Sequence, residues 1–150
     1  MSNSIEILAR GVCLQNNHVL LCKNNARGNV YLPGGHVELG EDSATALARE
    51  WQEEIGLSCT VGPLLGVAEQ QYDAPGEGPV SEISLVFRAE SPDLPAPPAP
   101  PPSAEAYISF YWAPLDQIAA TGLLPLAIAQ ALPAWLANPT PPSPLWLSQY

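Results

Sequence analysis

The chain has 150 residues and a formal net charge of −10 at pH 7, with 15 acidic and 5 basic residues. This length suits one domain with a buried core, so we predict a single domain over residues 1–150. With so few cations the chain has no basic stripe to bind a nucleic-acid backbone, which excludes a polymeric nucleic-acid partner. A small anionic ligand fits this charge if a metal ion neutralises the site.

The first residues show no charged-then-apolar signal pattern, and no apolar run reaches the roughly 18 residues that a membrane span needs. We therefore expect a cytoplasmic protein without a membrane partner. Cys13, Cys22 and Cys59 are odd in number and lack the CxxC spacing of zinc sites, so they predict reduced thiols.

The chain opens with a predicted hairpin of two strands, residues 5–15 and 18–22. Asn16 and Asn17 join them, and asparagine tolerates the left-handed backbone of a tight turn. In this register Cys13 faces Leu20. A polar loop at 23–29 and a short strand at 31–32 follow. Lys23 and Arg27 in that loop are candidate substrate contacts, and a solvated loop is the alternative.

A helix is predicted from Asp42 or Ser43 to Gly56, because apolar residues recur at three- and four-residue steps. These are Ala44, Leu47, Ala48, Trp51 and Ile55. At about 100° per residue, three acids share a second face roughly 120° away. They are Glu50, Glu53 and Glu54. Such a face usually meets solvent, but a divalent cation would relieve a repulsion that only Arg49 is near enough to offset.

Carboxylate ligands favour a hard cation over zinc, so we predict Mg²⁺, with Mn²⁺ as the alternative, at Glu50, Glu53 and Glu54. Gly34 and Gly35 precede the helix, and glycine lets a backbone approach a ligand closely. The Gly34 carbonyl is therefore a fourth candidate metal ligand. Taken alone, the two glycines predict only a turn.

The stretch 35–57 reads Gly, five residues, Glu, seven residues, Arg-Glu-U, one residue, Glu-Glu, one residue, Gly-U, where U is bulky and apolar. A chance match at one start position is on the order of 10⁻⁸. This stretch resembles the Nudix box of the MutT-like Nudix hydrolase superfamily. Trp51 stands at a U position that is more often aliphatic. All seven fixed positions match, at Gly35, Glu41, Arg49, Glu50, Glu53, Glu54 and Gly56.

The resemblance implies an α/β/α sandwich, in which a mixed β-sheet lies between helices. It also implies metal-dependent hydrolysis of a nucleoside diphosphate linked to another group, by water attack on a pyrophosphate phosphorus. Glu53, Glu54 and Arg49 would be the catalytic residues, with Arg49 holding a carboxylate in place. The general base is Glu54 or Glu53 in the box, or an acid outside it.

Several roles stay open in the sequence. Glu105 and Glu82 are the candidate bases outside the box, while Glu41 either caps the helix or binds metal. His36 contacts the substrate phosphate or only its local backbone. The small-molecule nucleotide substrate is a nucleoside triphosphate or an ADP-ribose-like compound. An inactive Nudix domain that binds a nucleotide as a sensor or scaffold is the alternative function.

In the second half, residues 59–72 predict one or two strands broken at Gly62-Pro63, and a turn over 73–78 follows. Further strands are predicted at 82–90 and 107–112. Between them, the Pro-rich loop 92–102 should be extended polyproline II or disordered.

The chain ends with a predicted short helix at 113–121 and a second helix at 125–137, broken or bent at Pro133. The tail carries Trp146, Leu147 and Tyr150, which would be costly to leave in water. We expect the tail to pack on the domain or on a partner subunit, which would make a homodimer.

Overall fold

The computed structural model describes residues 4–76, 78–138 and 145–149. Its elements in chain order are β1 (Ser4–Val12), β2 (Leu14–Gln15), β3 (His18–Asn24), β4 (Val30–Tyr31), β5 (Gly34–His36), α1 (Ser43–Ile55), β6 (Thr60–Ala74), β7 (Gly78–Glu90), β8 (Ile108–Pro114), the 3₁₀ helix η1 (Leu115–Ala120), α2 (Leu126–Ala137) and β9 (Leu145–Gln149).

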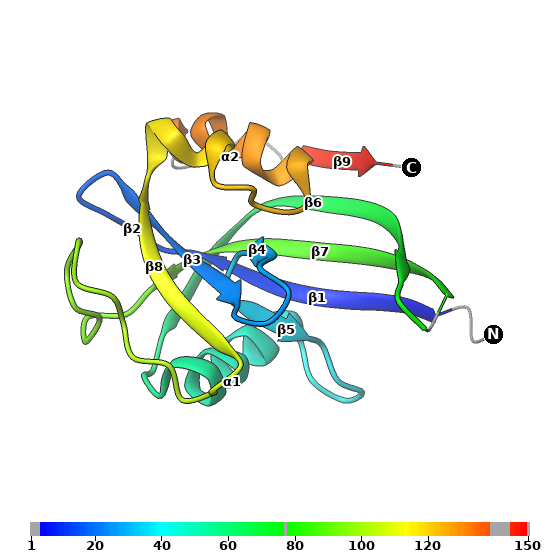
Figure 1. Cartoon of the computed structure of the whole chain (residues 1–150), viewed down its shortest axis with the longest axis horizontal. Coiled ribbons are helices and arrows are strands. Elements are labelled where there is room, and N and C mark those ends of the chain that lie inside the picture. Colours follow the sequence, from blue (N-terminus) through cyan, green and yellow to red (C-terminus); the bar gives the residue numbers. More distant parts are fainter. Residues whose placement is uncertain (1–3, 77, 139–144, 150) are drawn as a thin grey trace.

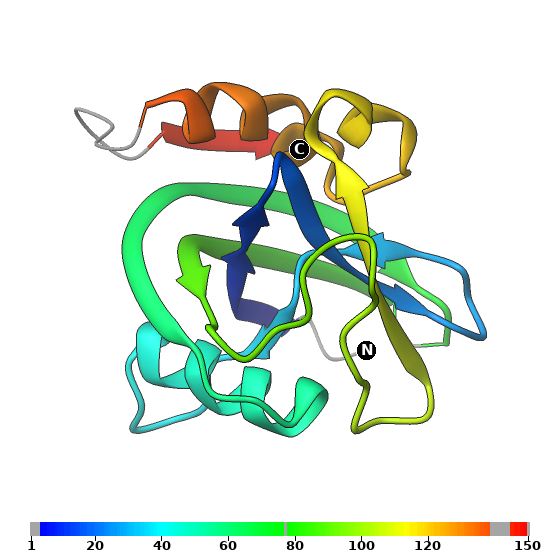
Figure 2. The same ribbon diagram turned by 90° about the vertical axis from the view of Figure 1, so that its left-hand side faces the viewer.

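The strands form two sheets. The larger is mixed, in the order β5-β1-β7-β6-β9, with parallel pairing of β1 to β7 and of β6 to β9. In the smaller sheet β3 pairs antiparallel with β2, β4 and β8. Figure 1 shows α1 on one side of the strands and α2 on the other, and Figure 2 shows the same layers from the side. This confirms the predicted α/β/α arrangement.

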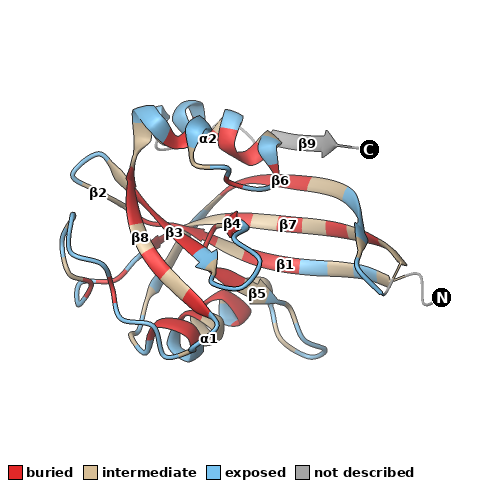
Figure 3. Ribbon diagram, in the orientation of Figure 1, coloured by how far each residue is buried: buried red, intermediate tan, exposed pale blue. Residues whose placement is uncertain are grey.

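Each side of the larger sheet has its own buried core, and burial is concentrated along the central strands and the inner helix faces (Figure 3). Trp51 of α1 lies in one core and Trp135 of α2 in the other, and both side chains are almost fully buried. The two helical layers are therefore anchored independently, one on each face of the sheet.

The helix α1 begins and ends close to where the sequence predicts. Asp42 caps it by accepting a 2.9 Å hydrogen bond from the Thr45 amide, and Gly56 ends it at φ 80°. Leu47, Trp51 and Ile55 are buried as predicted. The buried face is rotated, however: Ala46 and Glu54 complete it instead of Ala44 and Ala48.

The N-terminal hairpin is confirmed by the left-handed turn at Asn16 and Asn17 and by a 3.0 Å bond from the Leu20 amide to the Cys13 carbonyl. The predicted strand 5–15 is divided, because β1 joins the larger sheet and β2 the smaller. All three cysteines are free thiols.

The strands β6 and β7 are longer than predicted. β6 runs unbroken through Gly62-Pro63, because register shifts between Val61 and Gly66 absorb the irregularity. The predicted turn 73–78 was too long, since β6 extends to Ala74 and β7 starts at Gly78. The strand β5 was not predicted at all.

The Pro-rich loop 92–102 contains turns but no helix or strand. It lies against β8, since the Trp112 indole donates a 3.0 Å hydrogen bond to the Ala99 carbonyl. Of the two outcomes predicted at Pro133, a break or a bend, the break was wrong, because α2 continues through this residue. The backbone of Trp146 and Leu147 pairs with β6, whereas Tyr150 lies outside the described residues. None of the helices in the described ranges is long and apolar enough to cross a membrane.

Candidate active site

Arg49 lies among three acids of the motif. Its Nη2 is 2.7 Å from Glu41 Oε1, and its Nη1 is 3.1 Å from Glu53 Oε2 and 3.3 Å from Glu50 Oε1. Nη2 also donates a 3.0 Å bond to the His36 carbonyl on β5. The hydrogen bond between Arg49 and Glu41 is the main cause that raises the pKa of Arg49 and lowers the pKa of Glu41. Arg49 thus ties α1 to β5 and to the loop before the helix.

Glu54 carries a buried carboxylate, with 8% of the residue exposed. Burial raises the pKa of Glu54 to about 7, and the charges of Glu50 and Glu105 add to the rise while Arg10 opposes it. The Gly34 amide is its hydrogen-bond donor, at a long 3.4 Å from Oε2. Glu54 is therefore suited to exchange a proton near neutral pH.

Gly34 and Gly35 are both closely packed against their neighbours. Gly34 has φ 126°, and a Cβ there would overlap the Ala9 carbonyl oxygen. At Gly35 a Cβ would overlap the carboxyl group of Glu50. The Glu50 carboxylate thus lies directly against the backbone at the start of the motif.

The predicted metal ligands offer only oxygen donors, and the desolvated Glu54 carboxylate is one that a cation would stabilise. The residues present therefore fit a hard divalent ion. Within the described ranges, however, no three Asp, Glu, His or Cys side chains are already gathered into a metal centre. Glu50 and Glu53 instead face Arg49. The ligand set stays a prediction.

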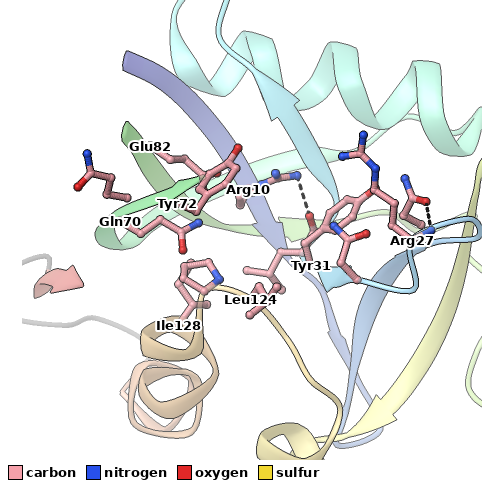
Figure 4. A pocket seen from close by; sticks show the side chains of 13 residues that line it. Arg10, Arg27, Tyr31, Gln70, Tyr72, Glu82, Leu124 and Ile128 are labelled. Atoms are coloured by element: carbon pink, nitrogen blue, oxygen red, sulfur yellow. Dashed lines mark hydrogen bonds between the residues drawn. The ribbon is translucent and has the colours of Figure 1, made fainter. Parts of the chain in front are cut away.

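Next to the motif is a cavity of about 530 Å³ between the larger sheet and the N-terminal end of α2 (Figure 4). Its size suits a small-molecule ligand. Among the sequence-predicted substrate contacts Arg27 lines it, whereas Lys23 and His36 do not. The residues that line the cavity are Arg10, Asn24, Arg27, Asn29, Tyr31, Leu32, Gln70, Gln71, Tyr72, Glu82, Leu124, Pro125 and Ile128.

Arg10 connects this cavity to the motif. It lines the cavity, its guanidinium lies 5.0 Å from the centre of the Tyr31 ring, and its Nη1 donates bonds of 3.2 Å to Leu32 O and 2.5 Å to Gly34 O. Sequence reasoning missed Arg10. The available signal was a cation within a predicted strand, in a chain that holds only five Lys and Arg residues.

The remaining predicted residues, His36, Glu105 and Glu82, lie in three different places. His36 turns its ring toward Glu6, with Nε2 3.3 Å from Oε2, and its side chain is 63% exposed. Glu105 is close enough to Glu54 to contribute to the rise of its pKa. Glu82 lies instead in the cavity wall. Of the two candidate bases outside the motif, Glu105 is therefore the one near it.

Parts of the chain are similar in sequence to known proteins. An ADP-ribose pyrophosphatase of Methanocaldococcus jannaschii is 42% identical over 81 residues, covering 51% of this chain and 46% of that protein. The 8-oxo-dGDP phosphatase NUDT18 of Homo sapiens is 48% identical over 48 residues, covering 32% of this chain and 15% of its own length. The chain thus spans less than half the length of these curated relatives.

Solved structures show the same fold. The MutT protein from Methanosarcina mazei Go1 superposes with a TM-score of 0.70 at 21% identity, covering 94% of this chain and 99% of that one. The NUDIX domain model matches residues 6–135, which is most of the sequence. The chain therefore belongs to the Nudix family.

Proposed function

We propose that this protein is a metal-dependent hydrolase that cleaves the pyrophosphate linkage of a nucleoside diphosphate joined to another group. The observation that carries the proposal is the junction at Arg10. This residue lines the cavity and also donates to the Gly34 carbonyl, beside the buried Glu54 carboxylate. A nucleotide in the cavity would therefore have its phosphates next to the acidic motif.

Glu50, Glu53, Glu54 and the Gly34 carbonyl would hold the divalent ion, with Mg²⁺ the favoured metal and Mn²⁺ the alternative. When bound, the ion supplies positive charge for the phosphate oxygens and makes water a stronger nucleophile. Glu54 would take the proton of the attacking water, because its buried carboxylate lies beside Gly34 at the proposed metal site. Glu105 is the alternative base.

The remaining residues orient these groups. Arg49 holds the carboxylates of Glu41, Glu50 and Glu53 in place and so acts by positioning. Arg27 offers a cation at the cavity for the substrate phosphates. Lys23 and His36 would have to contact the part of the substrate that extends beyond the cavity.

The names of similar proteins support a nucleoside diphosphate derivative as the substrate. The names of the relatives include an ADP-ribose pyrophosphatase and an 8-oxo-dGDP phosphatase, and each name denotes a nucleoside with a diphosphate. A panel assay with Mg²⁺ and then Mn²⁺ tests the proposal, using ordinary and oxidised nucleoside di- and triphosphates, ADP-ribose and dinucleoside polyphosphates. Cleavage of at least one class at its pyrophosphate bond is expected. Nucleotide binding without turnover would instead favour a sensor.

Changing Glu53 tests the assigned metal ligands. Glu53→Gln should lower turnover at least ~100-fold, because it removes a negative charge from the metal site. The side chain of Glu53 is 54% exposed, so the fold should be retained. Glu38→Gln is the matched control, since it makes the same change in the exposed loop before α1 and should leave turnover unchanged. Near-native turnover in Glu53→Gln would refute the assignment.

A further inference from the structure

Glu82 of β7 is a buried acid in the cavity wall that the proposed reaction does not use. The residue is 7% exposed and lines the cavity. Its Oε1 accepts a 2.7 Å hydrogen bond from the Ser84 hydroxyl. A buried carboxylate is costly unless several donors satisfy it, and each of its two oxygens has room for more than one. Glu82 therefore has accepting capacity left for a ligand in the cavity.

The position of Glu82 suits the base end of a nucleotide. In the larger sheet Glu82 pairs with Glu6 of β1, which lies four residues from Arg10 along that strand. At about 3.3 Å per residue, Glu82 and Arg10 are roughly 13 Å apart along the strand direction. This separation is comparable to the reach of a nucleoside diphosphate from its base to its terminal phosphate. Phosphates near Arg10 thus place the base near Glu82.

The neighbours of Glu82 suit a flat, partly apolar group. Gln70 of β6 pairs with Glu82 across the sheet and also lines the cavity. In Figure 4 the side chains of Glu82, Gln70 and Tyr72 gather at one end of the cavity, with Arg10 between them and Tyr31. Leu124 and Ile128 face them from the side of α2. Aromatic and aliphatic walls with a few polar groups are typical of nucleobase pockets.

The chemistry of a carboxylate distinguishes between bases. A carboxylate can only accept hydrogen bonds, so it pairs with an edge that presents adjacent N–H donors. Guanine presents such an edge, with N1–H beside the N2 amino group. Adenine presents the N1 acceptor at the corresponding place, which would face the carboxylate with like polarity. Oxidation at C8 lies on the opposite edge of guanine and leaves this pairing intact.

We propose that Glu82 is a specificity-determining residue that selects guanine-type bases, ordinary or C8-oxidised, over adenine. The inference rests on the proposed function for the placement of the phosphates. It narrows the substrate to guanine nucleotides, whereas the acidic motif alone accepts any nucleoside diphosphate derivative.

Binding of uncleaved nucleotides tests the inference apart from catalysis. The probes are guanosine, inosine and adenosine triphosphates with a methylene group in place of the α,β-bridging oxygen, titrated calorimetrically with Mg²⁺. The wild-type protein should bind the guanosine form at least ~10-fold more tightly than the adenosine form. Inosine, which lacks the N2 amino group, should lie between them.

Glu82→Gln should abolish this preference, because an amide presents one donor and one acceptor and pairs well with adenine. Glu90→Gln is the matched control, an exposed acid at the far end of the same strand, and should keep the preference. If Glu82→Gln fails to fold, Ser84→Ala carries the test by removing the hydroxyl that holds the carboxylate. A reduced guanine preference there supports the inference, and an unchanged one counts against it.

Three results would overturn the inference: equal wild-type affinity for the guanine and adenine probes, no binding of any probe, or an equal loss for all three in Glu82→Gln. The last would mean that Glu82 contacts the sugar or only supports the fold. Guanine-selective binding without hydrolysis would refute the hydrolase and keep the inference. Hydrolysis without base preference would support the hydrolase and refute the inference about Glu82.

Discussion

At the scale of single residues, Glu54 couples the proposed chemistry to folding stability. Its pKa is raised from 4.5 to about 7, mainly by burial. Between pH 4.5 and about pH 7 the carboxyl group of Glu54 stays protonated in the folded protein but is ionised in the unfolded chain. Raising the pH through this window therefore favours unfolding. The contribution of protonated Glu54 to the free energy of unfolding is complete below pH 4.5 and lost above about pH 7.

We predict that the metal-free protein loses stability relative to Glu54→Gln when the pH rises from 5 to 8. At about 1.4 kcal/mol per pKa unit, the relative loss is on the order of 3 kcal/mol at most. Urea unfolding at several pH values in the presence of a chelator measures it. If the free energy of unfolding changed with pH in the same way in wild type and Glu54→Gln, a raised pKa of Glu54 would be refuted.

The adjacent glycines Gly34 and Gly35 should respond differently to alanine. In Gly34→Ala the Cβ meets a backbone oxygen and the φ of 126° is strained, so we predict a stability loss of about 3 kcal/mol or more. In Gly35→Ala the Cβ meets the flexible end of Glu50, which can turn away. We predict a loss under about 1 kcal/mol there, but turnover at least ~10-fold lower because a metal ligand is displaced.

Thermal unfolding together with turnover of the best panel substrate measures both variants. The expected pattern is a destabilised Gly34→Ala and a stable, impaired Gly35→Ala. A fully active Gly35→Ala would show that the position of Glu50 against the Gly35 backbone has no role in the reaction.

At the scale of elements, Arg49 holds α1, β5 and the intervening loop in one arrangement. Its guanidinium bonds to Glu41 through two nitrogens, Nη2 at 2.7 Å and Nε at 3.2 Å, while also reaching the His36 carbonyl. A lysine ammonium is a single point charge and cannot make these bonds together. We predict that Arg49→Lys lowers kcat 10- to 100-fold, with a smaller change in KM.

Steady-state kinetics across a range of Mg²⁺ concentrations checks this prediction. A positioning role requires that saturating Mg²⁺ fails to restore kcat in Arg49→Lys. Arg88→Lys, on β7 outside the motif and the cavity lining, should behave like wild type. Full recovery of kcat at high Mg²⁺ would show that Arg49 acts only on metal affinity.

The elements that sequence could predict are those specified locally. The helix α1 carries its own cap at Asp42, its own stop at Gly56 and a regular apolar repeat. The extents of β6 and β7 depend on pairing between the two strands, which carried β6 through Gly62-Pro63 where the local pattern predicted a break. Propensity along one segment contains no information about a partner strand.

The candidate site likewise has one part that is specified locally in the sequence and one part that the fold assembles. The acidic motif is contiguous in sequence, so its members could be named before the structure was known. The cavity draws Arg10, Gln70, Glu82 and Leu124 from four separate segments, which only the fold brings together. The sequence predicts Glu82 only as a candidate base, and the register of β1, β7 and β6 places it in the cavity wall.

At the scale of the whole molecule, two glycine–tryptophan contacts attach the helical layers to the sheet. On one face Gly11 lies against Trp51 of α1, where an added Cβ would be 3.1 Å from the ring. On the other face Gly66 lies against Trp135 of α2, where an added Cβ would overlap the ring. The layer of α1 carries the acidic motif, and the segment that leads into α2 forms the cavity wall.

This arrangement predicts that binding of metal and binding of nucleotide can be impaired separately. Gly66→Ala should displace Trp135 and with it α2, including the cavity residues Pro125 and Ile128. We predict a stability loss of about 1–3 kcal/mol from overpacking and an affinity at least ~10-fold lower for the methylene guanosine nucleotide. Calorimetric titration should show Mg²⁺ affinity in the absence of nucleotide within about twofold of wild type, because the layer of α1 is untouched.

Gly11→Ala is the reciprocal variant. It should weaken the binding of Mg²⁺ more than the binding of nucleotide, because its Cβ presses on Trp51 of α1, the helix that carries the acidic motif. Guanidinium unfolding of both variants separates these effects from general loss of fold. If each variant weakened the binding of metal and the binding of nucleotide equally, the two layers would have to move as one body. The division of the molecule into a metal-binding layer and a base-binding layer would then be wrong.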